Sequence, residues 1–462
     1  MVYQTLYQKF KKQEQVKAGV IGSGHYGKAL ITQSMYNPYL SIPAIADTDL
    51  KAAKTAYELC GIAPEDIVEC TTHSQAAQAL EKGKYLVMED PMIMMDLDLD
   101  IIAESTGIPE AGAKYVEACV KHGKHIAMIN KETDSVLGPY LKKMANDAGL
   151  LYTPVEGDQH GLLMSMVSWA KSLGLEIINA GKMRDAEYVY TPDQRHVICL
   201  RDGDPEGEQI VSAEQIKFLD DLPEGEIAEY LRVRKEILPN LPHTRNFDIC
   251  ECVVAANALG MAPDIPELHL PIVRTREIPR ALCSQEDGGI LSRRGVLDSI
   301  TQLRTPQEAN LGGGVYIVVS SDNEYSRYIL NSKGLMHNTS GSASLIYRPY
   351  HLCGVETSTS LLCAAMLGFE TGYEEYHQTY DMVRVTTRDM KQGEIIGDDY
   401  SFDYYSKIVP ATKMRGEQPI PAHMAFGNRL KTDVPEGSVL TYDMIERPEN
   451  SALWRLREDS EK

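Results

Sequence analysis

The sequence predicts an α/β protein that begins with a doubly wound parallel sheet and continues into further domains. Short apolar strands alternate with helical stretches over about the first 155 residues, with glycine-containing links, as is typical of parallel sheets. The length of 462 residues is enough for about three domains. Near the C-terminus the pattern changes to short β segments with tight glycine turns, which predicts a small separate β domain.

Composition and charge narrow the classes of function. Hydrophobic residues make up 43% of the chain and charged residues 24%, which is typical of a globular protein. The 46 Lys and Arg face 66 Asp and Glu, and a net charge of −20 repels phosphate backbones and anionic lipid. We therefore expect neither a nucleic-acid nor a membrane partner. The nine cysteines lack zinc-site spacing and the start of the chain lacks a signal-peptide core, so we expect reduced thiols and a cytoplasmic location.

The first predicted strand runs directly into a glycine motif. Gly22, Gly24 and Gly27 form G-x-G-x-x-G ahead of a helical stretch. The first glycine permits a tight turn, the second lets the backbone approach a pyrophosphate, and the third lets helix and strand pack closely. The next strand ends in Asp47, where a carboxylate can accept a hydrogen bond from an adenosine ribose. This pattern predicts a Rossmann-type domain that binds NAD or NADP.

The choice between the two cofactors stays open in the sequence. Asp47 favours NAD because it would repel a 2′-phosphate, whereas Lys51 and Lys54 are near enough to accommodate one. Further strand ends at residues 104–107 and 130 add polar groups to the same domain. The predicted cofactor contacts are Gly22, Gly24, His25, Tyr26, Gly27, Asp47, Ser105, Thr106, Gly107 and Asn130.

Four polar side chains in the middle of the chain occupy predicted strand ends. They are Lys131, Asp158, His160 and Lys182. The carboxyl ends of strands in open α/β sheets border the crevice where ligands bind, so we expect these residues at one site.

Two basic clusters are candidates for holding an anion. Arg293 and Arg294 form a pair of guanidinium groups, which bind phosphate or carboxylate through a rigid fork. The alternative is that Glu286 and Asp287, just upstream, neutralise them. Arg348 and His351 lie on either side of a proline turn and are close enough to address one ligand, and the alternative for the histidine is a buried structural role.

The C-terminal region contains a repeated pattern. Residues 389–396 and 433–440 both read as an acid, three residues, a glycine, a polar residue and two apolar residues. Such pairs predict compact β structure between residues 382 and 446. Residues 371–380 would be a linker, and the charged residues 447–462 a mobile tail.

Together these motifs resemble the homoserine-dehydrogenase-like oxidoreductases that carry a C-terminal SAF domain, including the deoxyxylulose-phosphate reductoisomerase-like enzymes. The resemblance covers nearly the whole chain. It rests on the glycine motif and on residues 104–107, 130–132, 156–160, 180–182, 248–251, 286–295 and 347–351.

The resemblance implies a domain plan and an activity. It implies a Rossmann domain over residues 1–155 with a return helix near 355–370, an α+β catalytic and dimerisation domain over 156–354, and a β-clip SAF domain over 382–446. The implied protein is a homodimeric NAD(P)-dependent oxidoreductase acting on a small anionic sugar phosphate, polyol or hydroxy acid, with reductoisomerase chemistry as one form. Homoserine dehydrogenase activity and a non-catalytic dinucleotide- or sugar-sensing module are the alternatives.

The implied roles follow from the same resemblance. Lys182 would be the general acid/base, with a pKa lowered by desolvation, and Lys131 would bridge cofactor and substrate. The standard reductoisomerase holds a divalent metal through a Pro-Val-Asp-Ser-Glu-His stretch. Here residues 154–160 are only similar, so Glu156 and Asp158 are candidate ligands for Mg²⁺ or Mn²⁺. The alternative is that they orient Lys182 or cap the next helix.

Overall fold

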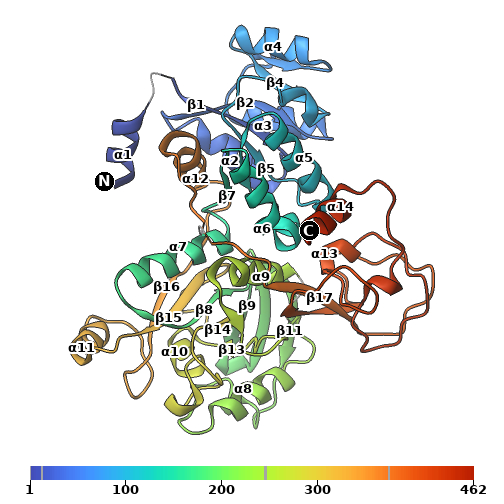
Figure 1. Ribbon diagram of the computed structural model, residues 1–462. Helices are drawn as coiled ribbons and strands as arrows, with labels where there is room; N and C mark the ends of the chain where they lie inside the picture. Colours follow the sequence, from blue (N-terminus) through green and yellow to red (C-terminus); the bar gives the residue numbers. More distant parts are fainter. Residues whose placement is uncertain (1, 12–13, 244–246, 373–374) are drawn as a thin grey trace.

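The computed structural model describes residues 2–11, 14–243, 247–372 and 375–462 (Figure 1). A parallel sheet with helices on it forms one body, a mixed sheet forms a second, and the C-terminal module, defined as residues 380–446, lies beside both (Figure 1). The predicted α/β class with a Rossmann-type sheet is confirmed. Within the described residues, no helix is both long and apolar enough to cross a bilayer.

The N-terminal sheet is entirely parallel and has the strand order β3-β4-β2-β1-β5-β6-β7. Its strands are β1 Val16–Ile21, β2 Leu40–Ala46, β3 Ile67–Glu69, β4 Tyr85–Met88, β5 Ile101–Glu104, β6 His125–Met128 and β7 Tyr152–Pro154. Its helices are α1 Val2–Phe10, α2 His25–Ser34, α3 Leu50–Leu59, α4 His73–Glu81, α5 Pro109–Lys121 and α6 Lys131–Asp147. All strands run the same way, so the loops after them meet at one edge of the sheet.

A late segment returns to this N-terminal domain. Helix α12, Ser358–Leu362, continues into a π-helical turn at Cys363–Leu367. Leu361 and Leu362 are fully buried in one cluster with Val20 of β1 and Ile45 of β2. The apolar face of this segment therefore packs on the parallel sheet, although more than 200 residues separate them in sequence.

The second sheet is mixed and has nine strands. Strand β8 lies inside it, parallel to β14 on one side and antiparallel to β15 on the other. The strands are β8 Glu176–Met183, β9 Ala186–Thr191, β10 His196–Arg201, β11 Asp204–Ile210, β12 Ala262–Pro263, β13 Ile272–Val273, β14 Val296–Arg304, β15 Val315–Ser320 and β16 Ser344–Arg348. The helices are α7 Gln159–Ser172, α8 Ile227–Glu236, α9 Phe247–Leu259, α10 Ile278–Ala281 and α11 Glu324–Ser332. Helices α7 and α9 pack together over one face of the sheet.

The C-terminal module consists of short β segments around one hairpin. Strands β17, Tyr380–Thr386, and β18, Tyr404–Pro410, pair antiparallel, and isolated bridges such as Val385 with Val439 connect the remaining turns. It also contains the short helix α13, Ala422–Ala425. Its assignment to the SAF family stays a prediction. Part of the linker predicted at 371–380 lies outside the described residues.

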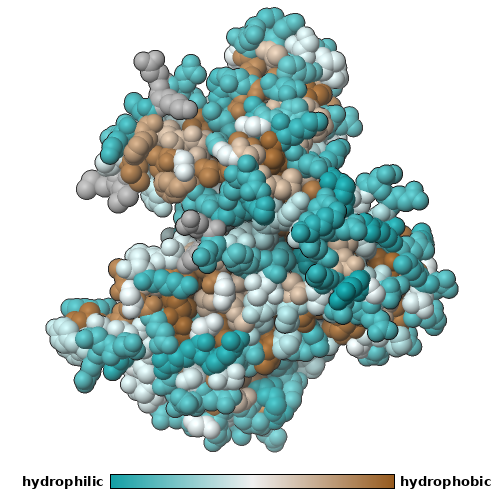
Figure 2. Space-filling view, viewed as in Figure 1, coloured by the Kyte–Doolittle hydropathy of each residue, from teal (hydrophilic) through white to brown (hydrophobic). Residues whose placement is uncertain are grey.

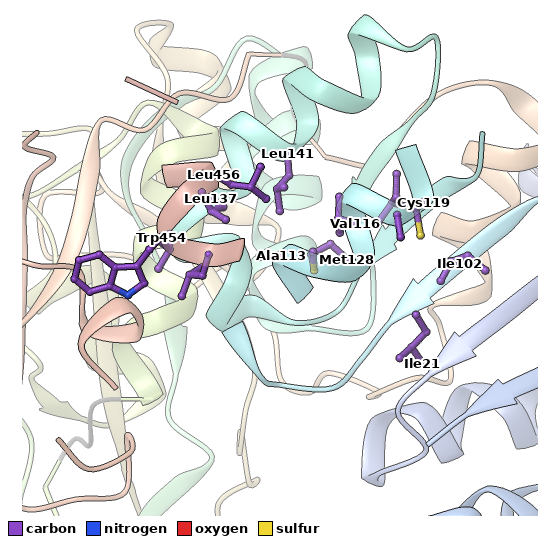
Figure 3. Close-up of a cluster of buried hydrophobic side chains, with 14 of the residues drawn as sticks. Ile21, Ile102, Ala113, Val116, Cys119, Met128, Leu137, Leu141, Trp454 and Leu456 are labelled. Carbon is purple, nitrogen blue, oxygen red and sulfur yellow. The ribbon is translucent and has the colours of Figure 1, made fainter. Parts of the chain in front are cut away.

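The mobile tail predicted for residues 447–462 is wrong. Residues Ala452–Asp459 form helix α14, which packs on α5 and α6. Figure 3 shows Trp454 and Leu456 beside Leu137 and Leu141 of α6 in one buried cluster. The charges dominate the composition of this segment, but its apolar residues share one helical face, and that face is buried.

Candidate active site

The glycine loop after β1 has two tightly packed positions and one open one. A Cβ on Gly27 would lie 2.1 Å from the Gly22 carbonyl oxygen, and Gly22 itself has a φ of +91° and a close contact with Ser105. A Cβ on Gly24 would meet nothing within 4 Å. Gly22 and Gly27 therefore serve packing, whereas Gly24 faces open space at the start of α2. His25 and Tyr26 form the first turn of that helix.

Asp47 holds the glycine loop from the end of β2. Its Oδ2 accepts hydrogen bonds from the Ser23 backbone N–H (2.6 Å) and hydroxyl (2.7 Å), and its Oδ1 accepts one from the Asp49 N–H (2.8 Å). Lys54, which could have met a 2′-phosphate, pairs instead with Glu69 at 2.8 Å.

A pocket of about 390 Å³ opens beside Asp47, where β2, β3 and β4 end. Its lining includes Thr48, Glu69, Glu89, Asp90 and Tyr115. The three carboxylates make this pocket unfavourable for a phosphate group.

The loop after β5 is tied to both the glycine loop and α6. The Ser105 hydroxyl donates to the Gly22 carbonyl at 2.7 Å, and the Asn130 amide donates to Thr106 Oγ1 at 3.1 Å. Beneath it, the Glu104 carboxylate accepts from the Thr106 N–H at 3.1 Å. Burial raises the pKa of Glu104 to about 7. The loop continues to Gly107, which has a φ of +66°.

Two lysines and one glutamate form a buried cluster where the two main domains meet. Lys131 is the first residue of α6, Lys182 lies on β8, and Glu251 lies on α9. The Lys182 ammonium donates to Glu251 Oε2 at 2.6 Å, and the Lys131 ammonium donates to Oε1. The Lys182 and Glu251 side chains are 2% and 4% exposed, whereas that of Lys131 is 21% exposed. The cluster is therefore reached from the Lys131 side, and Figure 2 shows the surface indented where these domains meet.

The electrostatics of this cluster keep Glu251 and Lys131 charged. Burial opposes ionisation of Glu251, but the Lys131 and Lys182 charges outweigh it and hold its pKa well below the usual range. Burial likewise opposes the charge on Lys131, yet Glu251 and Asp158 raise its pKa well above the ordinary value. Lys182 is buried as expected and lies beside the Glu251 carboxylate, and its lowered pKa stays a prediction.

Glu251 was missed as a site residue, although the sequence contains a signal for it. It lies in an otherwise apolar helical run with Cys250, Cys252 and Val253, all of them buried. A carboxylate on a buried helix face must be paired, because an isolated buried charge is strongly unfavourable. A search for the cations that could reach it would have connected α9 with the two predicted lysines.

Asp158, His160 and Tyr26 lie around this cluster. The Asp158 charge contributes to the raised pKa values of Lys131 and, after the larger effect of burial, of Tyr26. The Tyr26 hydroxyl is 2.7 Å from Thr357 Oγ1, which connects α2 to the loop before α12. His160 Nδ1 lies 3.8 Å from Asp158 Oδ1, and neither ring nitrogen has a hydrogen-bond partner among the described residues.

The metal site proposed for Glu156 and Asp158 is not supported. Glu156 Oε1 accepts from the Ser165 hydroxyl at 2.9 Å, and Asp158 caps the start of α7. Within the described part of the chain, no group of three or more His, Cys, Asp or Glu side chains could hold a metal ion. The capping alternative describes Asp158 better.

The predicted arginine pair lies at the wrong end of the sheet. Arg294 donates to Glu176, the first residue of β8, at 2.7 Å and to Asp287 at 3.0 Å, and Arg293 donates to the Pro263 carbonyl at 3.2 Å. Lys182 is six residues further along β8, which is about 20 Å at ~3.3 Å per residue. Asp287 therefore neutralises Arg294, which agrees with the alternative interpretation. The two arginines do not lie near the lysines.

Arg348 and His351 are nearer to the lysines but already engaged. Arg348 lies opposite Val315, which in turn lies opposite Lys182. Its guanidinium donates to Glu356 at 2.6 Å and stacks over Tyr350. His351 Nδ1 bonds the carbonyl oxygen of Gly313 at 2.6 Å. The two side chains do not converge on one ligand position.

Comparison with known proteins finds one family match, which lies mostly in the second domain. Residues 244–357 match the family described as "Oxidoreductase DRL, catalytic domain", which is about a quarter of the chain. The matched segment contains Glu251 and both strands that flank β8. No curated protein matches the chain.

Several solved structures share part of the fold. KijD10, a 3-ketoreductase from Actinomadura kijaniata in complex with NADP and TDP-benzene, is 17% identical over 39% of this chain and 50% of that chain (TM-score 0.26). Scyllo-inositol dehydrogenase from Lactobacillus casei is 14% identical over 39% and 48% (0.26). An oxidoreductase from Agrobacterium radiobacter in complex with NAD⁺, L-tartaric acid and magnesium is 15% identical over 48% and 55% (0.28). The chain spans about half the length of these structures.

The fold, the site and the family match bear on the chemistry of this protein. A glycine loop on a parallel sheet faces a buried lysine cluster, and the second of these two domains matches an oxidoreductase catalytic domain.

Proposed function

We propose that the protein is an NAD(P)-dependent oxidoreductase that interconverts the carbonyl and carbinol of a small anionic sugar phosphate, polyol or hydroxy acid. The observation that carries the proposal is the Lys131–Glu251–Lys182 cluster. It joins the first residue of α6, at the carboxyl edge of the nucleotide sheet, to the catalytic domain.

The residues of the N-terminal domain fit a dinucleotide. The open face of Gly24 and the N-terminus of α2 would receive the pyrophosphate. Asp47 would accept from the adenosine ribose, and the pocket lined by Thr48 and Tyr115 would receive the adenine. The acidic lining and the Lys54–Glu69 pair favour NAD over NADP. When bound, the nicotinamide supplies or accepts a hydride.

The lysines act on the substrate oxygen. In the reduction direction a carbonyl oxygen gains negative charge, and an ammonium beside it stabilises that charge and donates the proton. Glu251 keeps Lys131 protonated and holds both ammonium groups in place. In the oxidation direction Lys182, in its neutral form, accepts the carbinol proton.

The two lysines share one carboxylate, so their ammonium groups are close to each other. A keto oxygen and an adjacent hydroxyl oxygen of the substrate can each contact one of these ammonium groups. This arrangement supports the reductoisomerase-like form of the reaction, in which both oxygens must be held together. A homoserine-dehydrogenase-like reaction would need only one of the two ammonium groups.

Titration of the full-length protein with NADH and NADPH, followed by turnover with sugar phosphates, polyols and hydroxy acids, tests the proposal. We expect micromolar cofactor binding and turnover with one of these classes. Cofactor binding without turnover on any of them would favour the sensing alternative. The absence of cofactor binding would contradict the proposal outright.

A further inference from the structure

A second cavity lies between the catalytic domain and the C-terminal module. Its volume is about 320 Å³. Helices α8 and α9, the loop between β12 and β13, strand β14 and strand β18 contribute to its lining. The lining residues that matter here are Lys235, His243, Leu268, Leu270, Thr301 and Tyr405.

The cavity gathers basic side chains in a chain with a net charge of −20. Lys235 is exposed to solvent and has no ion-pair partner within the described residues. Partial burial lowers its pKa, and the Asp298 charge acts in the opposite direction. Burial also lowers the pKa of His243, and the charges of Lys235 and Arg184 lower it further. The acidic residue in the lining, Glu267, is paired with Lys407 at 2.7 Å. An anion in the cavity would add a counter-charge to the one that Asp298 already supplies.

The apolar side of the cavity has an unusual backbone. Leu268 and Leu270 have φ values of 58° and 49°, in the left-handed region that branched side chains rarely adopt. Asp298 fixes them, because its carboxylate accepts from the His269 N–H at 3.1 Å and from the Leu270 N–H at 3.0 Å. Strained conformations of this kind persist where the surroundings enforce them, and they cluster at ligand sites.

A polar group is positioned on the opposite side. Arg184 is buried and donates to Thr301 Oγ1 at 3.2 Å, as well as to the carbonyl oxygens of Pro242 and His243. Because the Thr301 oxygen already accepts from Arg184, its hydroxyl hydrogen is free to be donated elsewhere. Thr301 and the Lys235 ammonium can then both address one anionic group.

We propose that this cavity binds a small organic phosphate or carboxylate that carries a short aliphatic body. The anionic group meets Lys235 and the Thr301 hydroxyl, and the aliphatic part packs on Leu268 and Leu270. Thr301 is two residues along β14 from Ser299, the strand neighbour of Lys182, which is about 7 Å at ~3.3 Å per residue. The anion is therefore either the far end of the substrate or a separate ligand of the same chemistry.

Calorimetric titration of the full-length protein with n-butyl phosphate tests this site. Saturating NADH or NADPH is present, so that the glycine loop cannot take the phosphate. If neither cofactor binds, the Gly24→Val variant serves instead, and the test stays independent of the proposed function. We expect one binding site that Lys235→Met weakens at least tenfold, whereas Lys235→Arg stays within about threefold. The matched control Lys333→Met changes an exposed lysine on the far side of the domain and should bind like the wild type.

Equal affinity of the wild type and Lys235→Met would overturn the proposal, as would no binding at millimolar butyl phosphate. Urea unfolding of each variant confirms that the fold is intact. Inhibition kinetics then show whether the anion in the cavity is the far end of the substrate or a separate ligand. Competition between butyl phosphate and the substrate places the substrate's anionic end in the cavity, and non-competitive inhibition shows a separate ligand.

Discussion

At the scale of single residues, the charge on Glu251 decides what the two lysines can do. Buried ion pairs are weakly stabilising on balance, but breaking one by removing a partner costs about 3–5 kcal/mol. Here one carboxylate serves two ammonium groups, so removal of either lysine leaves Glu251 with a partner. The cluster can therefore lose one lysine without losing the fold, which makes a test of each lysine's chemistry practicable.

Replacement of Lys182 by methionine should remove most of the turnover while cofactor affinity stays unchanged. Methionine keeps most of the side-chain volume but supplies neither charge nor proton. General acid/base groups contribute about 10²–10⁴-fold, so kcat should fall by that factor. Steady-state kinetics and NADH titration measure the two effects, with Lys121→Met, an exposed lysine at the end of α5, as the control. A near-normal kcat would make Lys131 the reacting lysine.

Glu104 should make stability depend on pH in a defined direction. Burial raises its pKa from 4.5 to about 7 in the folded protein. The stabilisation is fully present below the unfolded pKa and is lost as the pH rises through about 7, because the folded state must then hold a buried charge. The loss amounts to about 3 kcal/mol.

The variant Glu104→Gln cannot ionise and should lack this dependence. Urea unfolding of the wild type and the variant at pH 5 and pH 8 measures it. We expect the variant to gain stability relative to the wild type at pH 8. A free-energy difference between the two proteins that is equal at both pH values would show that Glu104 does not titrate in this range.

At the scale of elements, the glycines of the loop between β1 and α2 have different surroundings, and we assign them different roles. Gly27 is needed because a side chain there would meet the Gly22 carbonyl at 2.1 Å, whereas Gly24 has free space around its Cα. The sequence predicted the packing role of Gly27 correctly, since the spacing of a glycine motif after a strand fixes the local backbone. The binding role of Gly24 stays a prediction. The sequence did not predict that Asp47 holds Ser23, which depends on how β2 lies beside β1.

The variant Gly24→Val should therefore lose cofactor binding but keep the fold. A valine side chain would fill the space that we assign to the pyrophosphate, and we expect the affinity for NADH to fall at least about 100-fold, or ~2.7 kcal/mol. Gly27→Val is the matched comparison, and it should lower the unfolding midpoint because its side chain meets backbone. Unchanged NADH affinity in Gly24→Val would mean that this loop does not hold the cofactor.

At the scale of the whole molecule, sequence patterns predicted the local elements but not which distant residues the topology brings together. The expectation that Lys131 and Lys182 lie at the ends of strands and near each other agrees with the structure. Arg293 and Arg294 precede β14, and β14 runs parallel to β8, so they lie at the amino edge, opposite the lysines. Glu251 was missed because its partners are 120 and 69 residues away, although its place in an apolar helical run indicates that it needs a cation. The homodimer, the cytoplasmic location and the SAF assignment stay predictions.

The C-terminal helix also ties the domains together, through one buried arginine. Arg457 of α14 donates to the Val136 carbonyl of α6 at 2.7 Å and to Asp381 of β17 at 2.7 Å. The Arg457 and Asp381 side chains are 4% and 3% exposed, so their charges compensate each other away from water. This single guanidinium connects the nucleotide domain with the C-terminal module.

Replacement of Arg457 by methionine should loosen the C-terminal module from the nucleotide domain. Asp381 would stay buried without its cation, and the expected loss of stability is about 3–5 kcal/mol. Methionine preserves the apolar part of the side chain, so the effect reports the lost charge and hydrogen bonds. We expect calorimetry to show one unfolding transition for the wild type and two for the variant, with the C-terminal module unfolding first. The exposed Arg455, which pairs with Glu117 on the surface of α5, provides the control, since surface pairs contribute only about 0–1 kcal/mol. Equal unfolding curves for Arg457→Met and Arg455→Met would show that α14 does not couple the domains.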